Sequence, residues 1–144
     1  MTDSNLRSVS LTRTGVHTFE ATNVRGGRFS FGEGSDTDFT PVELLLAAIG
    51  GCSSIDVDYL TSRRAEPETF EVTVTAPKLS DDQGNHLGEV VVDFRIRFPA
   101  GEGGDAARQR LVPAVVRSRD RLCTVSRTVQ LPTDVTYQVE GRTV

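Results

Sequence analysis

The sequence predicts one α+β domain over residues 1–144, with antiparallel β-sheets around a long central helix. Segments in which every second residue is apolar, which is typical of strands, alternate along the chain with segments of helical periodicity. The first half of one helical segment, Val42 to Ile49, is apolar nearly all round, which is typical of a buried helix. A length of 144 residues also favours a single domain. The expected order of elements is β-β-β-α-β-β-α-β.

The first three strands form a predicted antiparallel meander. Residues 8–13 and 16–22 alternate apolar and polar side chains. The turn after them, Arg25-Gly26-Gly27, contains glycines that tolerate a positive φ. The third strand carries Phe29 and Phe31 on one face. Because the three segments follow one another closely, we expect them to pair as neighbours in one sheet.

The central helix is predicted to run from Pro41 to about Ser62. Thr40 is a favourable N-cap, proline suits the first helical position, and Glu43 stands three residues after the cap, so a capping box is expected. Burial of the leucines that follow stabilises the fold by about 1.5–3 kcal/mol for each side chain. This gain favours complete coverage of the helix, which a dimer that holds it between two sheets would provide.

Two adjacent glycines, Gly50 and Gly51, lie in the middle of this helix and directly precede Cys52. They cost about 2 kcal/mol of helix propensity relative to two alanines. We therefore expect either that another backbone approaches the helix closely at this point or that the helix bends beside Cys52.

The rest of the chain predicts a second β unit, a second helix and a closing strand. The alternation of apolar and polar residues is strongest in the two strands of the β unit, which a polar hairpin loop separates. Pro113 is expected to bend or delay the second helix. The expected ranges are strands at 70–75 and 90–98 with a loop at 79–88, a helix at 105–122 and a strand at 135–139.

The composition excludes several classes of function. Twenty acidic and 16 basic residues give a formal net charge of −4, which argues against a general nucleic-acid binder. No apolar run approaches the roughly 18 residues of a membrane span, and the polar N-terminus lacks the apolar stretch of a signal peptide. We therefore expect a cytoplasmic protein without a nucleic-acid or membrane partner.

The chain has two cysteines, Cys52 and Cys123, and only two histidines. These side chains are too few and too widely spaced for a zinc or iron–sulfur site, so we expect no metal and no bound cofactor. A permanent disulfide between the cysteines is not expected in a reducing cytosol. If they pair there, the pairing is transient and catalytic; the alternative is that they are two unrelated buried thiols.

Two segments around the cysteines resemble the motifs of the OsmC/Ohr family, the osmotically inducible protein C and organic hydroperoxide resistance proteins. The first is TPVELLLAAIGGC at Thr40–Cys52, and the second is LCTVSRTV at Leu122–Val129. The element order also fits, so the resemblance covers nearly the whole chain. It implies an intertwined homodimer of curved antiparallel sheets around two central helices, and an enzyme that reduces organic hydroperoxides with thiols. No aromatic residue closely follows the first cysteine, and Thr124 follows the second. In both respects the chain resembles the broad OsmC-like branch more than a dedicated Ohr enzyme.

The resemblance also implies roles for particular side chains. Cys52 matches the family's peroxidatic cysteine, Cys123 its resolving cysteine, and Glu43 the glutamate at the helix start. The arginine beside the reactive sulfur is assigned to Arg28, with Arg25 as the rival assignment. The implied chemistry is attack of a thiolate on the peroxide, condensation of the sulfenic acid to a disulfide, and reduction by an external dithiol such as a lipoyl-bearing protein.

Glu43 and Cys52 cannot touch directly within a straight helix. They are 52 − 43 = 9 residues apart, which places them on opposite sides of an ideal helix and about 13.5 Å apart along its axis. A long arginine, a bend at the two glycines or a partner subunit must therefore connect them. This geometry favours a site at a dimer interface.

Other interpretations of these residues stay open. Glu43 can serve only in the capping box, and Arg28 can be an exposed strand residue. Six arginines within Arg108–Arg127 are interpreted as a solvated helix face rather than as an anion or nucleic-acid patch, because aspartates are interleaved with them. The same fold can instead be a binding module for an apolar small molecule, or a redox sensor based on a disulfide between Cys52 and Cys123.

Overall fold

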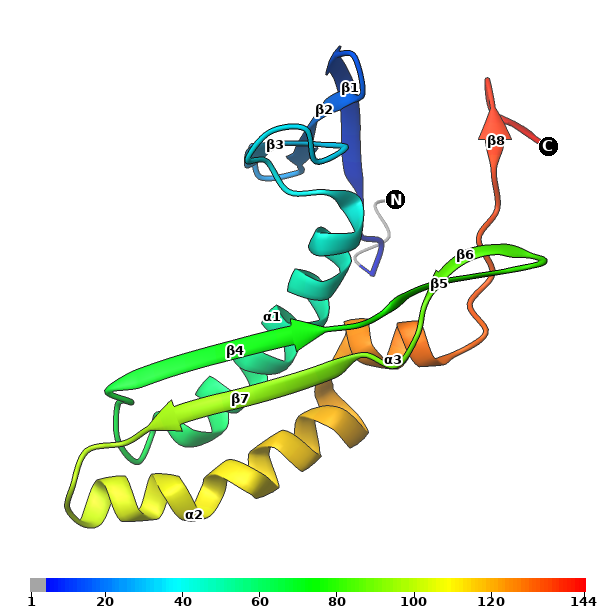
Figure 1. Cartoon of the computed structure of the whole chain (residues 1–144). Helices are drawn as coiled ribbons and strands as arrows, with labels where there is room; N and C mark the ends of the chain where they lie inside the picture. The colour runs from blue at the N-terminus through cyan, green and yellow to red at the C-terminus, as the bar shows by residue number, and fades with distance from the viewer. Residues whose placement is uncertain (1–4) are drawn as a thin grey trace. The chain divides into compact units, whose positions relative to one another are not determined.

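The computed structural model describes residues 5–144 of the chain (Figure 1). Its contacts group into two compact units, residues 1–45 and 46–144, and helix α1 (Pro41–Thr61) begins in the first and continues in the second. Residues 1–4 lie outside the described residues. They belong to the N-terminal segment in which the sequence predicts no signal peptide. That residues 1–144 form one domain stays a prediction.

The first unit contains an antiparallel sheet in the order β1-β2-β3, which confirms the predicted meander. Phe19 stacks on Phe31 with 5.9 Å between the ring centroids, and Phe29 lies 6.0 Å from Phe31. Phe31 is buried, whereas Phe29 is half exposed. The strands are β1 (Val9–Gly15), β2 (Thr18–Asn23) and β3 (Arg28–Gly32).

Helix α1 begins with the predicted capping box. The Thr40 N–H donates to Glu43 Oε1 at 2.8 Å, and the Glu43 N–H donates to Thr40 Oγ1 at 3.3 Å. Only one stripe of the helix is buried. The expectation that its first half is buried nearly all round is wrong for the single chain, where Val42 and Leu45 are 43% and 39% exposed. Ile55 and Tyr59 are 61% and 67% exposed because nothing in the second unit covers that side. The buried stripe consists of Ile49, Gly50, Ser53, Val57 and Thr61.

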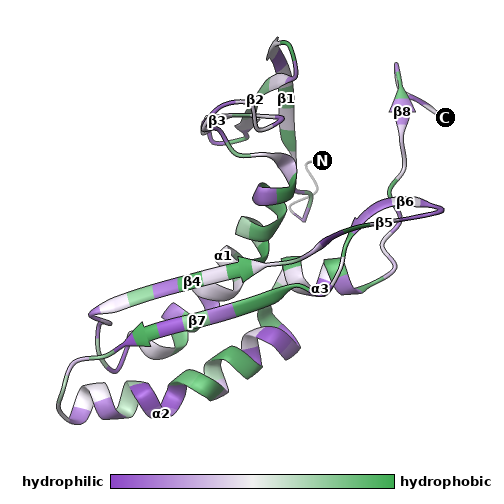
Figure 2. Cartoon of the chain, viewed as in Figure 1, coloured by the Kyte–Doolittle hydropathy of each residue, from purple (hydrophilic) through white to green (hydrophobic). Residues whose placement is uncertain are grey.

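The 21 residues of α1 are, by length and composition, also apolar enough to cross a membrane (Figure 2). The expectation that no segment reaches that length and hydropathy is therefore wrong for α1. Core helices of soluble proteins pass the same test. Within the second unit, two polar side chains of α1 form hydrogen bonds. Ser53 binds Cys123, and Asp56 binds Ser118.

The second unit contains the predicted β pair, now β4 (Thr69–Thr75) and β7 (Val91–Arg97), which are antiparallel with Val72 opposite Phe94. At Gly50, α1 lies so close to β4 that an added Cβ would come within 2.4 Å of Val74 Cγ2. The glycine is thus required by a close approach, as expected, although the neighbour is a side chain and not a backbone.

The predicted loop at 79–88 contains a short hairpin of its own, β5 (Lys78–Asp81) and β6 (Gly84–Leu87). Asp81 Oδ1 accepts hydrogen bonds from the backbone N–H groups of Gln83 and Gly84, which closes the turn. A second short hairpin, β8 (Gln138–Val139) and β9 (Arg142–Thr143), replaces the predicted closing strand at 135–139.

The predicted helix at 105–122 is divided into α2 (Glu102–Arg117) and a π-helical turn, η1 (Ser118–Leu122), and a further helix, α3 (Thr124–Gln130), follows. Pro113 lies inside α2 and does not end it. The order expected from the sequence therefore lacks α3 and the two short hairpins. Helix α3 follows η1 directly along the chain, and the single residue Cys123 joins them.

Candidate functional site

The structure brings Cys52 and Cys123 together, although 123 − 52 = 71 residues separate them in the sequence. The Cys52 thiol, on α1, interacts with the Cys123 thiol and with the backbone N–H groups of Thr124 and Val125 at the start of α3. Both cysteines are free thiols in this structure. The two thiols that the sequence motifs single out therefore belong to one site, between α1 and the start of α3.

Cys123 is held by two hydrogen bonds to its sulfur. Ser53 Oγ donates to Cys123 Sγ at 3.4 Å, and the Ser126 N–H donates to the same sulfur at 3.3 Å. The second bond makes Cys123 the N-cap of α3. Only 2% of Cys123 is exposed, whereas Cys52 is partly exposed. Cys52 is therefore the more accessible of the two thiols to a substrate.

The π-helical turn η1 sets the position of Cys123 relative to α1. The Cys123 N–H donates to the Ser118 carbonyl at 2.9 Å, and Ser118 Oγ donates to Asp56 Oδ2 on α1 at 2.8 Å. Ser118 is 1% exposed, and Asp56 lies one helical turn after Cys52. Sequence reasoning did not identify Ser118 or Asp56 as site residues. The feature of the sequence that could have identified Asp56 is a carboxylate four residues after a cysteine on an apolar helix.

Ser118→Ala is expected to lower the free energy of unfolding by about 1–3 kcal/mol, because it leaves the partly buried Asp56 carboxylate without its donor. Urea unfolding of the reduced protein measures this. Ser80→Ala is the matched control, since Ser80 is exposed in β5. If the two variants unfold at the same urea concentration, the bond between Ser118 and Asp56 does not anchor η1.

The surroundings of Cys52 favour its thiol over its thiolate. Partial burial raises the pKa of Cys52, and the neighbouring Cys123 thiol raises it further. The N–H groups of Val125 and Thr124 act in the opposite direction, but they do not outweigh the burial. None of the groups among residues 5–144 that shift the pKa of Cys52 is a cation. The chain by itself therefore holds Cys52 mainly protonated at neutral pH.

The other two candidate residues, Glu43 and Arg28, lie in the first unit. The bonds from Thr40 occupy the Glu43 carboxylate and lower its pKa. Arg28 Nε forms an ion pair with Glu20 Oε1, at 3.2 Å, on the neighbouring strand of the sheet. The rival Arg25 lies in the turn between β2 and β3, where its backbone N–H donates to Asn23 Oδ1. Roles for Glu43 and Arg28 beyond these contacts stay predictions.

An apolar cavity of about 620 Å³ lies within the second unit, beside the cysteine pair. Ser53 and Ser126, whose hydroxyl and N–H bind Cys123, line it. The size falls within the range of small-molecule sites. The remaining lining residues are Ile49, Leu87, Gly88, Glu89, Val90, Val92, Phe94, Val115, Arg119, Val129 and Gln130.

Residues 32–138 match the sequence profile of the family described as OsmC-like protein. The chain belongs to the OsmC-like family. An uncharacterized protein of Mycobacterium tuberculosis strain H37Rv is 27% identical over 128 residues, which are 88% of this chain and 91% of that protein.

Solved structures share the OsmC-like fold. An OsmC-like protein of unknown function from Vibrio cholerae is 11% identical, with a TM-score of 0.71 over 88% of this chain and 94% of that one. The organic hydroperoxide resistance protein OhrB of Bacillus subtilis is 17% identical, with a TM-score of 0.52 over 90% and 93% of the two chains. These likenesses confirm the predicted α+β fold, in which antiparallel strands accompany a long helix, and the resemblance noted from the cysteine motifs.

Proposed function

We propose that this OsmC-like protein is a cysteine-based peroxidase that reduces organic hydroperoxides with external dithiols. The observation that carries the proposal is the interaction between the thiols of Cys52 and Cys123, which the fold brings near each other from distant parts of the chain. The likeness in fold to an organic hydroperoxide resistance protein of Bacillus subtilis supports the choice of substrate class. We place the reaction in the cytoplasm, where the cysteines are kept reduced between cycles.

In this mechanism the Cys52 thiolate attacks one oxygen of the peroxide and breaks the O–O bond. The alkoxide takes up a proton and leaves as an alcohol, and Cys52 becomes a sulfenic acid. The Cys123 sulfur then attacks the Cys52 sulfur, water leaves, and a disulfide forms. An external dithiol reduces the disulfide by exchange and regenerates both thiols. The bonds that Ser53 and Ser126 donate to Cys123 Sγ hold the resolving sulfur in place for this step.

The proposed enzyme is a homodimer. In the single chain the exposed large apolar side chains outnumber the buried apolar ones, among residues 5–144. Four of the exposed ones share α1 with Cys52, and their burial in a second copy would stabilise the assembly. They are Val42, Leu45, Ile55 and Tyr59. A dimer would also allow an arginine of the partner to reach Cys52, and Arg28 is the arginine we assign to that role.

Stopped-flow oxidation of the reduced protein tests the proposal, with cumene hydroperoxide and hydrogen peroxide compared and free thiols counted afterwards. The expected result is rapid loss of two thiols in each chain, faster with the organic peroxide. A single rapid oxidation that dithiols do not reverse would instead favour a redox sensor. Slow or absent thiol loss would contradict the peroxidase.

The apolar cavity favours a second candidate function, the binding of an apolar small molecule without turnover. Its lining is mainly aliphatic and aromatic, and Cys52 does not contribute to it. Ligand binding by such a module would be unaffected by Cys52→Ser, whereas Phe94→Ala would weaken it by removing part of the cavity wall. Fluorescence titration with an apolar dye separates this function from the peroxidase.

A further inference from the structure

A second, polar pocket of about 350 Å³ lies beside Cys123. Three arginines, one aspartate and Cys123 itself line it, and all five residues belong to η1, to α3 or to the junction between them. The lining residues are Arg119, Asp120, Arg121, Cys123 and Arg127. We call this the basic pocket. It differs from the apolar cavity in its charge and in having Cys123 among its lining residues.

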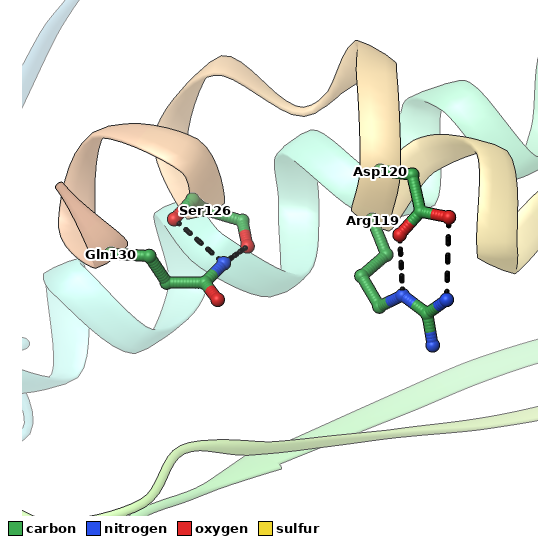
Figure 3. A network of polar contacts seen from close by, with 4 residues as sticks. All are labelled: Arg119, Asp120, Ser126 and Gln130. Carbon is green, nitrogen blue, oxygen red and sulfur yellow. Dashed lines mark hydrogen bonds and ion pairs between the residues drawn. The ribbon is translucent and has the colours of Figure 1, made fainter.

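The basic pocket has a surplus of positive charge in a protein whose formal net charge is −4. Asp120 is engaged by Arg119, with Oδ1 2.7 Å from Nε and Oδ2 3.3 Å from a terminal nitrogen (Figure 3). This pairing lowers the pKa of Asp120 and leaves it ionised. In the part of the chain that the structure describes, no ion pair involves Arg121 or Arg127. Three guanidinium groups beside one carboxylate leave the pocket with a net positive charge that can receive an anion.

The position of the pocket identifies which step it serves. Of the two cysteines, only Cys123 lines it. In the disulfide of the proposed cycle, a thiol that enters through this pocket therefore approaches from the side of Cys123. Guanidinium groups bind carboxylates through two parallel hydrogen bonds, so they orient an acidic ligand as well as attract it.

We propose that the basic pocket binds the carboxylate of an acidic dithiol and directs its thiol onto Cys123. This inference rests on the proposed function. One thiolate of the dithiol attacks Cys123 Sγ, the disulfide bond breaks, and Cys52 leaves as a thiolate. The second thiol of the ligand, as a thiolate, attacks the ligand sulfur of the mixed disulfide and releases Cys123. The dithiol is oxidised to a disulfide, and its two protons return to the two cysteines.

Reduction of the diamide-oxidised protein by dihydrolipoate and by dihydrolipoamide tests the proposal. The two reductants have the same dithiol, but dihydrolipoate has a carboxylate where dihydrolipoamide has a neutral amide. We expect dihydrolipoate to reduce the disulfide about tenfold faster at low salt, within the range of electrostatic steering, and the preference to fall as salt rises. In the double variant Arg121→Gln, Arg127→Gln the preference should disappear while the rate with dihydrolipoamide is kept.

Arg142→Gln is the matched control, because it removes one guanidinium outside the pocket, in β9, and should keep the preference. Equal rates with the two dithiols in the unmodified protein would overturn the proposal. An equal loss of both rates in the double variant would also overturn it, because that result indicates a disturbed disulfide and not a lost anion site.

The oxidation by diamide separates this proposal from the peroxidase. A protein that peroxides fail to oxidise, but that keeps the preference for dihydrolipoate, would contradict the proposed function and support the basic pocket. A protein that turns over peroxide without the preference would contradict the basic pocket alone. If diamide forms no disulfide between the two cysteines, both proposals are wrong.

Discussion

Cys52→Ser is expected to abolish turnover of cumene hydroperoxide. A serine hydroxyl is not ionised at neutral pH and forms no sulfenic acid, so neither oxidation nor disulfide formation can take place. The structure limits alternatives, because Cys123 is 2% exposed and its sulfur already accepts two hydrogen bonds. Cys123 is therefore a poor substitute for the missing nucleophile. Peroxide consumption in the presence of a dithiol measures the loss.

Cys123→Ser should behave differently from Cys52→Ser. Cys52 can still be oxidised once, but no neighbouring thiol condenses with the sulfenic acid. We expect one rapid oxidation, then a stall and conversion of Cys52 to sulfinic acid, which mass spectrometry of the intact protein detects. Near-ultraviolet circular dichroism serves as the folding control for both variants. If Cys52→Ser retained full activity, the mechanism would be wrong.

The parts of the fold that depend on local sequence could be predicted. The capping box at Thr40 and Glu43 requires only two side chains three residues apart, and both of its hydrogen bonds are present. The paired strands β4 and β7 have a clear alternation, and each occupies a predicted range to within a residue or two. Two glycines in a helix require compensation, for which either a close approach of another backbone or a bend was expected; at Gly50 the structure shows a close approach, by a side chain.

The parts that depend on tertiary contacts could not be predicted. A π-helical turn has no sequence periodicity of its own, and η1 is held by the hydrogen bond between Ser118 and Asp56, 118 − 56 = 62 residues apart. The predicted helix at 105–122 therefore included the residues of this turn, and the short helix α3 after it was not predicted. The basic pocket has the same origin. Its arginines were interpreted as a solvated face because aspartates are interleaved with them, and the sequence does not show that three of these arginines line one pocket with Cys123.

The candidate site was predicted in part. The motifs identified Cys52 and Cys123, and the structure brings their thiols near enough to interact. The activation of Cys52 was expected to come from an arginine. Instead, partial burial raises the pKa of Cys52, and no cation among the described residues opposes it. A single chain with this environment is poorly suited to attack a peroxide at neutral pH, so the proposed enzyme requires a further positive charge.

Arg28→Ala is therefore expected to slow the oxidation of Cys52 by about 100-fold at neutral pH. An adjacent guanidinium favours the thiolate, and its removal raises a thiol pKa by one to three units by analogy with other acids. Below its pKa, the thiolate fraction falls tenfold for each unit by which the pKa rises, so a shift of about two units gives the expected loss. The rate measured against pH should keep its plateau, but the inflection should move to higher pH.

Arg25→Ala is the matched control, because Arg25 lies in the turn between β2 and β3, three residues before Arg28. It should change the rate less than threefold and leave the inflection in place. The reverse result would move the assignment to Arg25. If neither variant shifts the inflection, the charge comes from neither arginine. Glu20→Gln is informative in the same assay, because it removes the ion-pair partner that holds Arg28 on its own sheet. If Arg28 must leave Glu20 to serve Cys52, this variant should oxidise faster than the unmodified protein.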